Sequence, residues 1–149
     1  MDETKKYIDS RKAAREFVLG LLFAKSFAPD DDTDEFFTRE IANADVSMGE
    51  RADYIREVFF GVCDRAEALD EKIASAAAGW NLSRLSKMTL SIMRLAVYEM
   101  TSVDDVPKRV ALNEAIELAK KYDDDKAPAF VNGVLNNIAG SLPDRECDK

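Results

Sequence analysis

Residues 90–100 read LSIMRLAVYEM, and this stretch decides the fold. Arranged as a helix, it is apolar on most sides, with Ile92, Met93, Leu95, Ala96 and Val97 distributed around its circumference. A helix that is hydrophobic nearly all round must be covered by other elements. We therefore expect residues 90–100 to form the buried centre of a helical core.

Apolar residues recur at helical spacing on both sides of this segment. Ala14, Val18 and Leu21, for example, fall on one face of a first helix. A capping box, Ser47 with Glu50, predicts the start of a long helix. No period-2 alternation is long enough to predict a strand. The predicted helices cover residues 4–27, a short segment around 36–41, 50–73, a short segment around 82–85, 90–100, 107–122 and 128–138.

The sequence therefore predicts an all-α fold, a compact bundle of about seven helices in two packed helical subdomains. Residues 1–149 are expected to form a single domain. Its N-terminal helical half covers about 4–78 and its C-terminal half about 80–140, with the seam at Gly79 and Trp80. The polar tail, residues 141–149, is expected to be frayed.

The composition argues against most enzyme classes. The chain contains no histidine, which excludes Ser-His-Asp and Cys-His nucleophile systems and histidine-ligated zinc or iron sites. The two cysteines, Cys63 and Cys147, form no CxxC motif. A calcium loop starting at Asp30 would need glycine and glutamate where Glu35 and Ile41 stand. We predict no catalytic residue, no metal and no cofactor.

The chain shows no signal peptide and no apolar run long enough to cross a bilayer, which predicts a cytoplasmic protein without a membrane partner. The net charge of −8 argues against indiscriminate coating of nucleic acid. Charge is nevertheless segregated, because the segment from Lys5 to Lys25 carries six basic and two acidic residues.

Segregated positive charge on an acidic protein indicates a nucleic-acid site. Arginine can hold phosphates with two hydrogen bonds or stack on unpaired bases. Composition alone also allows a solvated helix face with no ligand. The candidate RNA-binding residues in this segment are Lys5, Lys6, Arg11, Lys12 and Arg15.

The order of several motifs resembles the NusB family of transcription antitermination factors, over about residues 10–140. The strongest match lies in the second half and runs from Arg94 to Leu135. The matching motifs are RKAARE (11–16) with LLF (21–23), GV (61–62) with LD (69–70), RLAVYE (94–99), DVP (105–107), NEAIELAK (113–120) and FVNGVL (130–135).

The resemblance implies a protein that recognises single-stranded boxA-type RNA, typically in ribosomal RNA leaders, together with NusE, a small-subunit ribosomal protein. That assembly joins RNA polymerase and opposes termination, which supports rRNA transcription. Arg11, Lys12 and Arg15 match the family's RNA-binding helix. Phe130, near a helix start, is expected to be partly exposed and to touch RNA or partner. Gly133 is expected where another backbone approaches closely.

Two departures from the family pattern bear on RNA binding. Residues 126–129 read KAPA where familiar members carry basic or polar side chains before the FVNG motif, so Lys126 is the one charged side chain there, and Ser10 stands where a further arginine is common. The overall acidity of the chain predicts that the partner protein supplies much of the affinity for RNA. The resemblance leaves open whether the chain is a monomer or a homodimer.

Two other functions fit parts of this pattern. NusB-like domains also precede some RNA cytosine methyltransferase domains, but this sequence has no glycine-rich cofactor-binding segment. A helical protein–protein adaptor without RNA binding of its own remains the alternative, and it predicts partner binding that is insensitive to salt.

Overall fold

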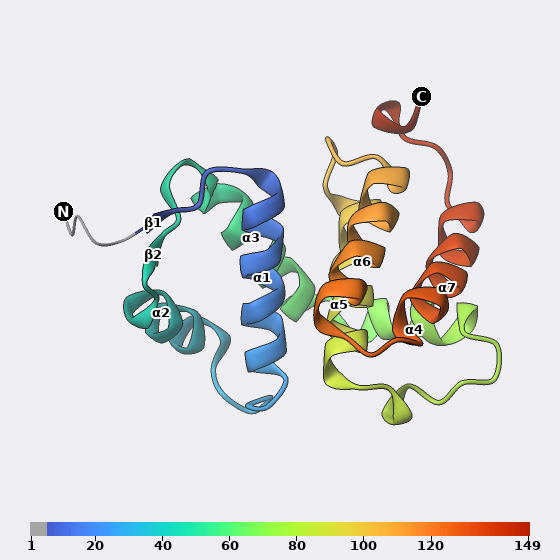
Figure 1. The fold of residues 1–149 in the computed structure, drawn as a ribbon, viewed down its shortest axis with the longest axis horizontal. Helices are drawn as coiled ribbons and strands as arrows, with labels where there is room; N and C mark the ends of the chain where they lie inside the picture. The colour runs from blue at the N-terminus through green and yellow to red at the C-terminus, as the bar shows by residue number, and fades with distance from the viewer. Residues whose placement is uncertain (1–5) are drawn as a thin grey trace. The chain divides into compact units, whose positions relative to one another are not determined.

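The computed structural model describes residues 6–149 and contains seven α-helices within that range, so the predicted all-α class is confirmed (Figure 1). The chain folds into two compact units, Met1–Cys63 and Asp64–Lys149. The helices are α1 (Arg11–Lys25), α2 (Thr33–Asn43), α3 (Ala52–Asp64), α4 (Ala66–Ala76), α5 (Lys87–Ser102), α6 (Lys108–Tyr122) and α7 (Ala127–Ser141).

The first helix begins later than the sequence predicted. Ser10 is its N-cap, and the Ser10 hydroxyl accepts a hydrogen bond of 3.0 Å from the Ala13 backbone N–H. Serine favours this position because its side chain satisfies an N–H group that has no partner inside the helix. Lys6 therefore precedes the helix, and Lys5 lies outside the described residues.

Two short strands, which the sequence did not predict, pair beside the start of α1. β1 (Lys6–Tyr7) and β2 (Val46–Ser47) are parallel, and the Ile8 N–H donates to the Ser47 carbonyl at 2.9 Å. Strands of two residues are too short to carry an alternating pattern, so only the tertiary structure could reveal them.

The core of the first unit is built around phenylalanine rings of α2 and α3. Phe36 and Phe37 of α2 lie with their ring centroids 6.1 Å and 5.4 Å from that of Phe59. All three side chains are buried. The short helix predicted around 36–41 is thus confirmed, and the two adjacent phenylalanines attach it to α3.

The long helix predicted over 50–73 is wrong, because the chain breaks at Arg65 and forms α3 and α4 instead. The Arg65 guanidinium donates to the Ser102 hydroxyl at 2.7 Å and lies over the Tyr98 ring. The predicted capping box is absent too, since Ser47 belongs to β2. The division between the units falls beside this break, whereas the sequence placed it near Gly79.

Helix α5 is the centre of the second unit, as the sequence predicted. It packs against α4, α6 and α7, and Figure 1 shows these helices gathered around it. Residues 95–100 are all buried, including the charged Glu99. The 3₁₀ turn Leu82–Arg84 leads into α5, whose N-cap Ser86 accepts a 2.9 Å bond from the Thr89 N–H.

Arg94 of α5 forms an ion pair with Asp70 of α4. Its Nε and Nη2 atoms donate to the two carboxylate oxygens of Asp70, both at 2.7 Å. This paired geometry needs the planar arginine fork, which lysine lacks. Two of the motifs noted in the sequence, at residues 69–70 and 94–99, therefore meet in one ion pair.

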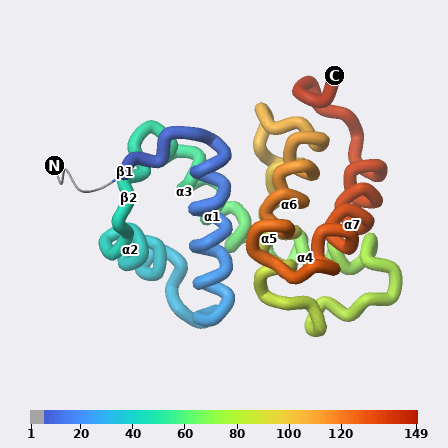
Figure 2. Tube along the Cα trace, viewed as in Figure 1, coloured from blue at the N-terminus to red at the C-terminus, as the bar shows by residue number. Residues whose placement is uncertain are grey.

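Figure 2 traces the tail beyond α7 in red to the C-terminus. Hydrogen bonds to the α5–α6 connection anchor this tail, so the prediction that it is frayed was wrong. The Arg145 guanidinium donates to the carbonyls of Val103 and Val106 in the α5–α6 connection. The Asp148 carboxylate accepts backbone N–H bonds from Lys108 at 2.7 Å and from Arg145 at 2.9 Å. These two donors hold the pKa of Asp148 below its ordinary value.

The Arg94–Asp70 pair is expected to contribute measurably to stability. Because lysine keeps the charge but loses the fork, Arg94→Lys should lower the free energy of unfolding by about 1–2 kcal/mol. Chemical denaturation measures this. Lys120→Ala is the control, since it removes an exposed pair with Glu117 and should cost less than about 0.5 kcal/mol. Equal costs for both variants would contradict the role given to Arg94.

The anchoring of the tail should depend on pH. The lowered pKa of Asp148 means that its ionised form stabilises the folded state. That contribution is complete above the unfolded pKa of about 4 and is lost as pH falls through the lower folded pKa. Asp148→Asn should therefore be less stable than wild type near pH 7, and the difference should shrink in strong acid. Thermal unfolding under both conditions tests this, and a pH-independent difference would contradict it.

Candidate nucleic-acid interface

Positive charge is concentrated at the N-terminal end of α1. Arg11 and Lys12 occupy the first turn, and no acidic residue lies in that turn. The helix dipole already places partial positive charge there, so each basic side chain costs roughly 0.3–1 kcal/mol. Basic residues at this end therefore lower the stability of the helix and strengthen its attraction for an anion.

Arg11 is positioned by an aromatic ring of α3. Its guanidinium carbon lies 4.5 Å from the ring centroid of Tyr54, which is within the range of a cation–π interaction. Tyr54 is buried, whereas Arg11 is half-buried. The ring therefore fixes the guanidinium at the edge of the unit before any ligand arrives.

The structure separates the predicted basic residues by exposure. Lys12 and Lys6 are exposed, as is the neighbouring Tyr7 of β1. Arg15, one turn after Arg11, is only 4% exposed. The sequence placed it beside the apolar stripe, but its side chain lies within the packed part of the structure. The side chains best exposed to a ligand are thus Lys6 and Lys12, with Arg11 less exposed.

Lys25 belongs to the other end of the helix. Its Nζ donates to the carbonyls of Ala28 at 2.9 Å and Pro29 at 3.1 Å, in the turn that follows α1. At 1.5 Å per residue it stands about 20 Å along the helix from Arg11. The basic segment of the sequence is therefore two separate features, and Lys25 has a structural role.

Phe130 lies in the first turns of α7 and is half-buried, which agrees with its predicted partial exposure. Its ring contacts Trp80 edge to face, with the centroids 5.1 Å apart. Trp80 is 58% exposed. The sequence pattern marked Trp80 only as part of a seam, although it is the sole tryptophan and stands beside a helix break.

Gly133 is not explained by close packing within the chain, contrary to expectation. A Cβ built on it would meet no atom within 4 Å, and the residue is exposed. The neighbouring Asn132 is exposed as well and accepts a 2.7 Å bond from Asn136 on the same helix. This face of α7 therefore points away from the described core of its unit.

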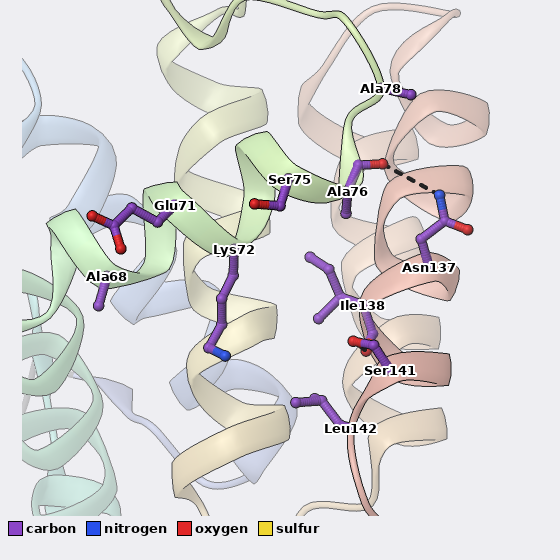
Figure 3. Close-up of a pocket in the computed structure, with 10 residues that line it drawn as sticks. All are labelled: Ala68, Glu71, Lys72, Ser75, Ala76, Ala78, Asn137, Ile138, Ser141 and Leu142. Carbon is purple, nitrogen blue, oxygen red and sulfur yellow. Dashed lines mark hydrogen bonds between the residues drawn. The ribbon is translucent and has the colours of Figure 1, made fainter.

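A groove of about 750 Å³ runs between α4 and α7 of the second unit (Figure 3). Figure 3 shows Lys72 and Ile138 pointing toward it, while the Asn137 amide donates to the Ala76 carbonyl at 3.2 Å. Its lining mixes alkyl groups, hydroxyls and single charges. None of the candidate RNA-binding residues that the structure describes lines it, so we do not include it in the interface.

The acidic run before α7 has a capping role. The Asp124 carboxylate accepts bonds from the N–H groups of Lys126 and Ala127, at 3.0 Å and 2.9 Å. Among residues 6–149, no three cysteine, aspartate or glutamate side chains gather as metal ligands would. Over the same range, no helix is both long and apolar enough to cross a membrane.

Comparison of the sequence with known proteins identifies its relatives. Residues 12–140 match the model of the NusB family. The chain is 38% identical over 146 residues to the transcription antitermination protein NusB of Geotalea daltonii, covering 93% of this chain and 100% of the relative. It is 42% identical over 131 residues to NusB of Clostridium novyi, covering 87% and 97% of the two chains.

Solved structures share the fold. The structure of T. maritima NusB superposes with a TM-score of 0.79 at 30% identity, covering 89% of this chain and 92% of that one. A complex of NusB and NusE with dsRNA gives 0.78 at 23% identity, covering 89% and 97%. The family model spans most of the chain, and the relatives agree with it along nearly their whole length. The chain belongs to the NusB family of transcription antitermination proteins.

Proposed function

We propose that this protein binds single-stranded boxA-type RNA together with NusE, within an RNA polymerase antitermination complex that supports rRNA transcription. It acts by binding and catalyses no reaction. The observation that carries the proposal is the first turn of α1, where Arg11 and Lys12 add positive charge to the positive end of the helix dipole.

The roles of the basic residues follow from their exposure. Lys6 and Lys12 are exposed and suit salt-sensitive contacts with phosphates. Arg11, held over Tyr54, suits a directional contact with a phosphate or a base. Arg15 is buried, which favours a supporting role through local charge and packing over direct contact. Lys5 stays a predicted RNA contact on sequence grounds alone.

The relatives support the choice of partners. They are transcription antitermination proteins, and one of the fold neighbours is a NusB solved in complex with NusE and dsRNA. A net charge of −8 opposes strong binding of RNA by this chain alone. NusE is therefore expected to supply much of the affinity, in the cytoplasm where transcription occurs.

The proposal favours single-stranded over double-stranded RNA. Sequence-specific recognition of RNA usually uses unpaired bases, which can stack on aromatic rings or arginine planes. The half-buried Phe130 and the guanidinium of Arg11 offer such surfaces. A double-stranded RNA of the same sequence should therefore compete with the single strand only weakly for binding to the protein.

The decisive measurement is the affinity of a fluorescein-labelled boxA-type RNA across a salt series, with and without NusE. Wild type should bind more tightly with NusE, and the affinity should fall steeply with salt. Lys6→Ala combined with Lys12→Ala should weaken binding and reduce the slope of log K against log salt by about 1.4, since each single-strand phosphate contact contributes about 0.7.

Lys120→Ala is the matched control, because it removes an exposed lysine of α6 that is not among the candidate RNA-binding residues. It should leave both the affinity and the salt slope unchanged. If wild type binds NusE with no dependence on salt and shows no affinity for RNA, the protein is a helical adaptor and the proposal is wrong.

A further inference from the structure

We infer that Trp80 is an RNA-contacting residue that stacks on an unpaired base, with the Phe130 ring as its support. This inference rests on the proposed function and adds to it a residue of the second unit. Trp80 is 58% exposed, whereas Phe130 is half-buried. The Trp80 indole is therefore exposed to solvent, and the half-buried Phe130 ring supports it from within the unit.

The geometry of the pair leaves the indole face available. The two rings meet at 65° with centroids 5.1 Å apart, an edge-to-face arrangement. Such a contact uses the edge of one ring against the other and does not cover both faces of the indole. Aromatic faces of this kind bind bases with little dependence on sequence, because every base has a π-face.

The backbone holds Trp80 in place. The Trp80 N–H donates to the carbonyl of the buried Ala77 at 3.1 Å and closes a tight turn after α4. Both central residues of the turn have positive φ, 38° at Ala78 and 88° at Gly79. This is the region that glycine enters freely and alanine enters at a cost. Trp80 thus follows a defined turn, which limits the entropy lost when a base binds.

A cation lies one helical turn from Phe130. Lys126 is the N-cap of α7, and the Phe130 N–H donates to its carbonyl at 3.3 Å, which is the spacing of one turn. Residues four apart lie on the same helix face. The exposed Lys126 can therefore meet the phosphate of a nucleotide whose base stacks on Trp80, the ring partner of Phe130.

A protein partner is the other ligand that an exposed tryptophan can serve, because tryptophan is common in interface centres. Such centres are depleted of charge and form closed apolar pockets. Trp80 lies instead in a polar loop, followed by exposed Asn81, Ser83 and Arg84, and Lys126 flanks its aromatic partner. An exposed aromatic ring with basic residues beside it fits an RNA strand better than it fits a protein partner.

Trp80 provides its own probe, since it is the sole tryptophan of the chain. Unlabelled boxA-type RNA added to wild type with NusE should quench the Trp80 fluorescence, provided that a tryptophan-free NusE is used. Trp80→Ala should weaken RNA binding about fivefold to a hundredfold. Trp80→Phe keeps a π-face and should lose much less. Trp80→Leu keeps apolar bulk only and should behave like alanine.

The salt slope separates stacking from phosphate contact. Trp80→Ala should leave the slope unchanged, whereas the variant that combines Lys6→Ala with Lys12→Ala reduces it. Thermal unfolding of each variant excludes loss of folding as the cause.

Each remaining outcome has one meaning. If RNA binds with full salt dependence while Trp80 fluorescence and the affinity of Trp80→Ala stay unchanged, the inference is overturned and the proposed function stands. If NusE alone changes the fluorescence and Trp80→Ala weakens only NusE binding, Trp80 is a protein contact and the inference fails. If wild type binds no RNA in any condition, the proposed function itself fails.

Discussion

The second unit depends on covering one helix. Helix α5 is apolar around nearly its whole circumference, and if it stayed in water the chain would lose the free energy gained by burying that apolar surface. The helices α4, α6 and α7 pack against it for this reason. Arg94 of α5 is half-buried, and the fork it makes with Asp70 ties α4 to the edge of the core. Burial supplies the driving force, and the ion pair adds geometric specificity.

The two ends of the described chain show opposite uses of charge. At the tail, Arg145 and Asp148 satisfy backbone carbonyls and N–H groups, so their charges stabilise the fold. At the start of α1, Arg11 and Lys12 oppose the helix dipole. Local choices that work against stability are expected at functional sites. This contrast, more than the number of basic residues, distinguishes the candidate RNA surface.

Part of the candidate site was predictable from sequence. Segregated charge indicated the basic segment, and helix periodicity indicated Phe130 near a helix start. The sequence could not show that Arg15 is buried and that Lys25 binds carbonyls of the turn after α1, because basic residues in one segment look alike until their packing is known. Trp80 was overlooked because its partner Phe130 is distant along the chain, and such contacts leave no local pattern.

The sequence by itself determined the helical class, the central position of α5 and the approximate bounds of α6 and α7, since these follow from apolar periodicity and prolines along the chain. Tertiary structure decided what periodicity does not encode. The break at Arg65 interrupts a stripe that continues in phase on both sides, and the pairing of β1 with β2 joins residues that are distant along the chain. The anchored tail likewise depends on carbonyls of a distant connection. Contacts between residues that are distant along the chain form only when the whole chain folds, and local sequence patterns do not encode them.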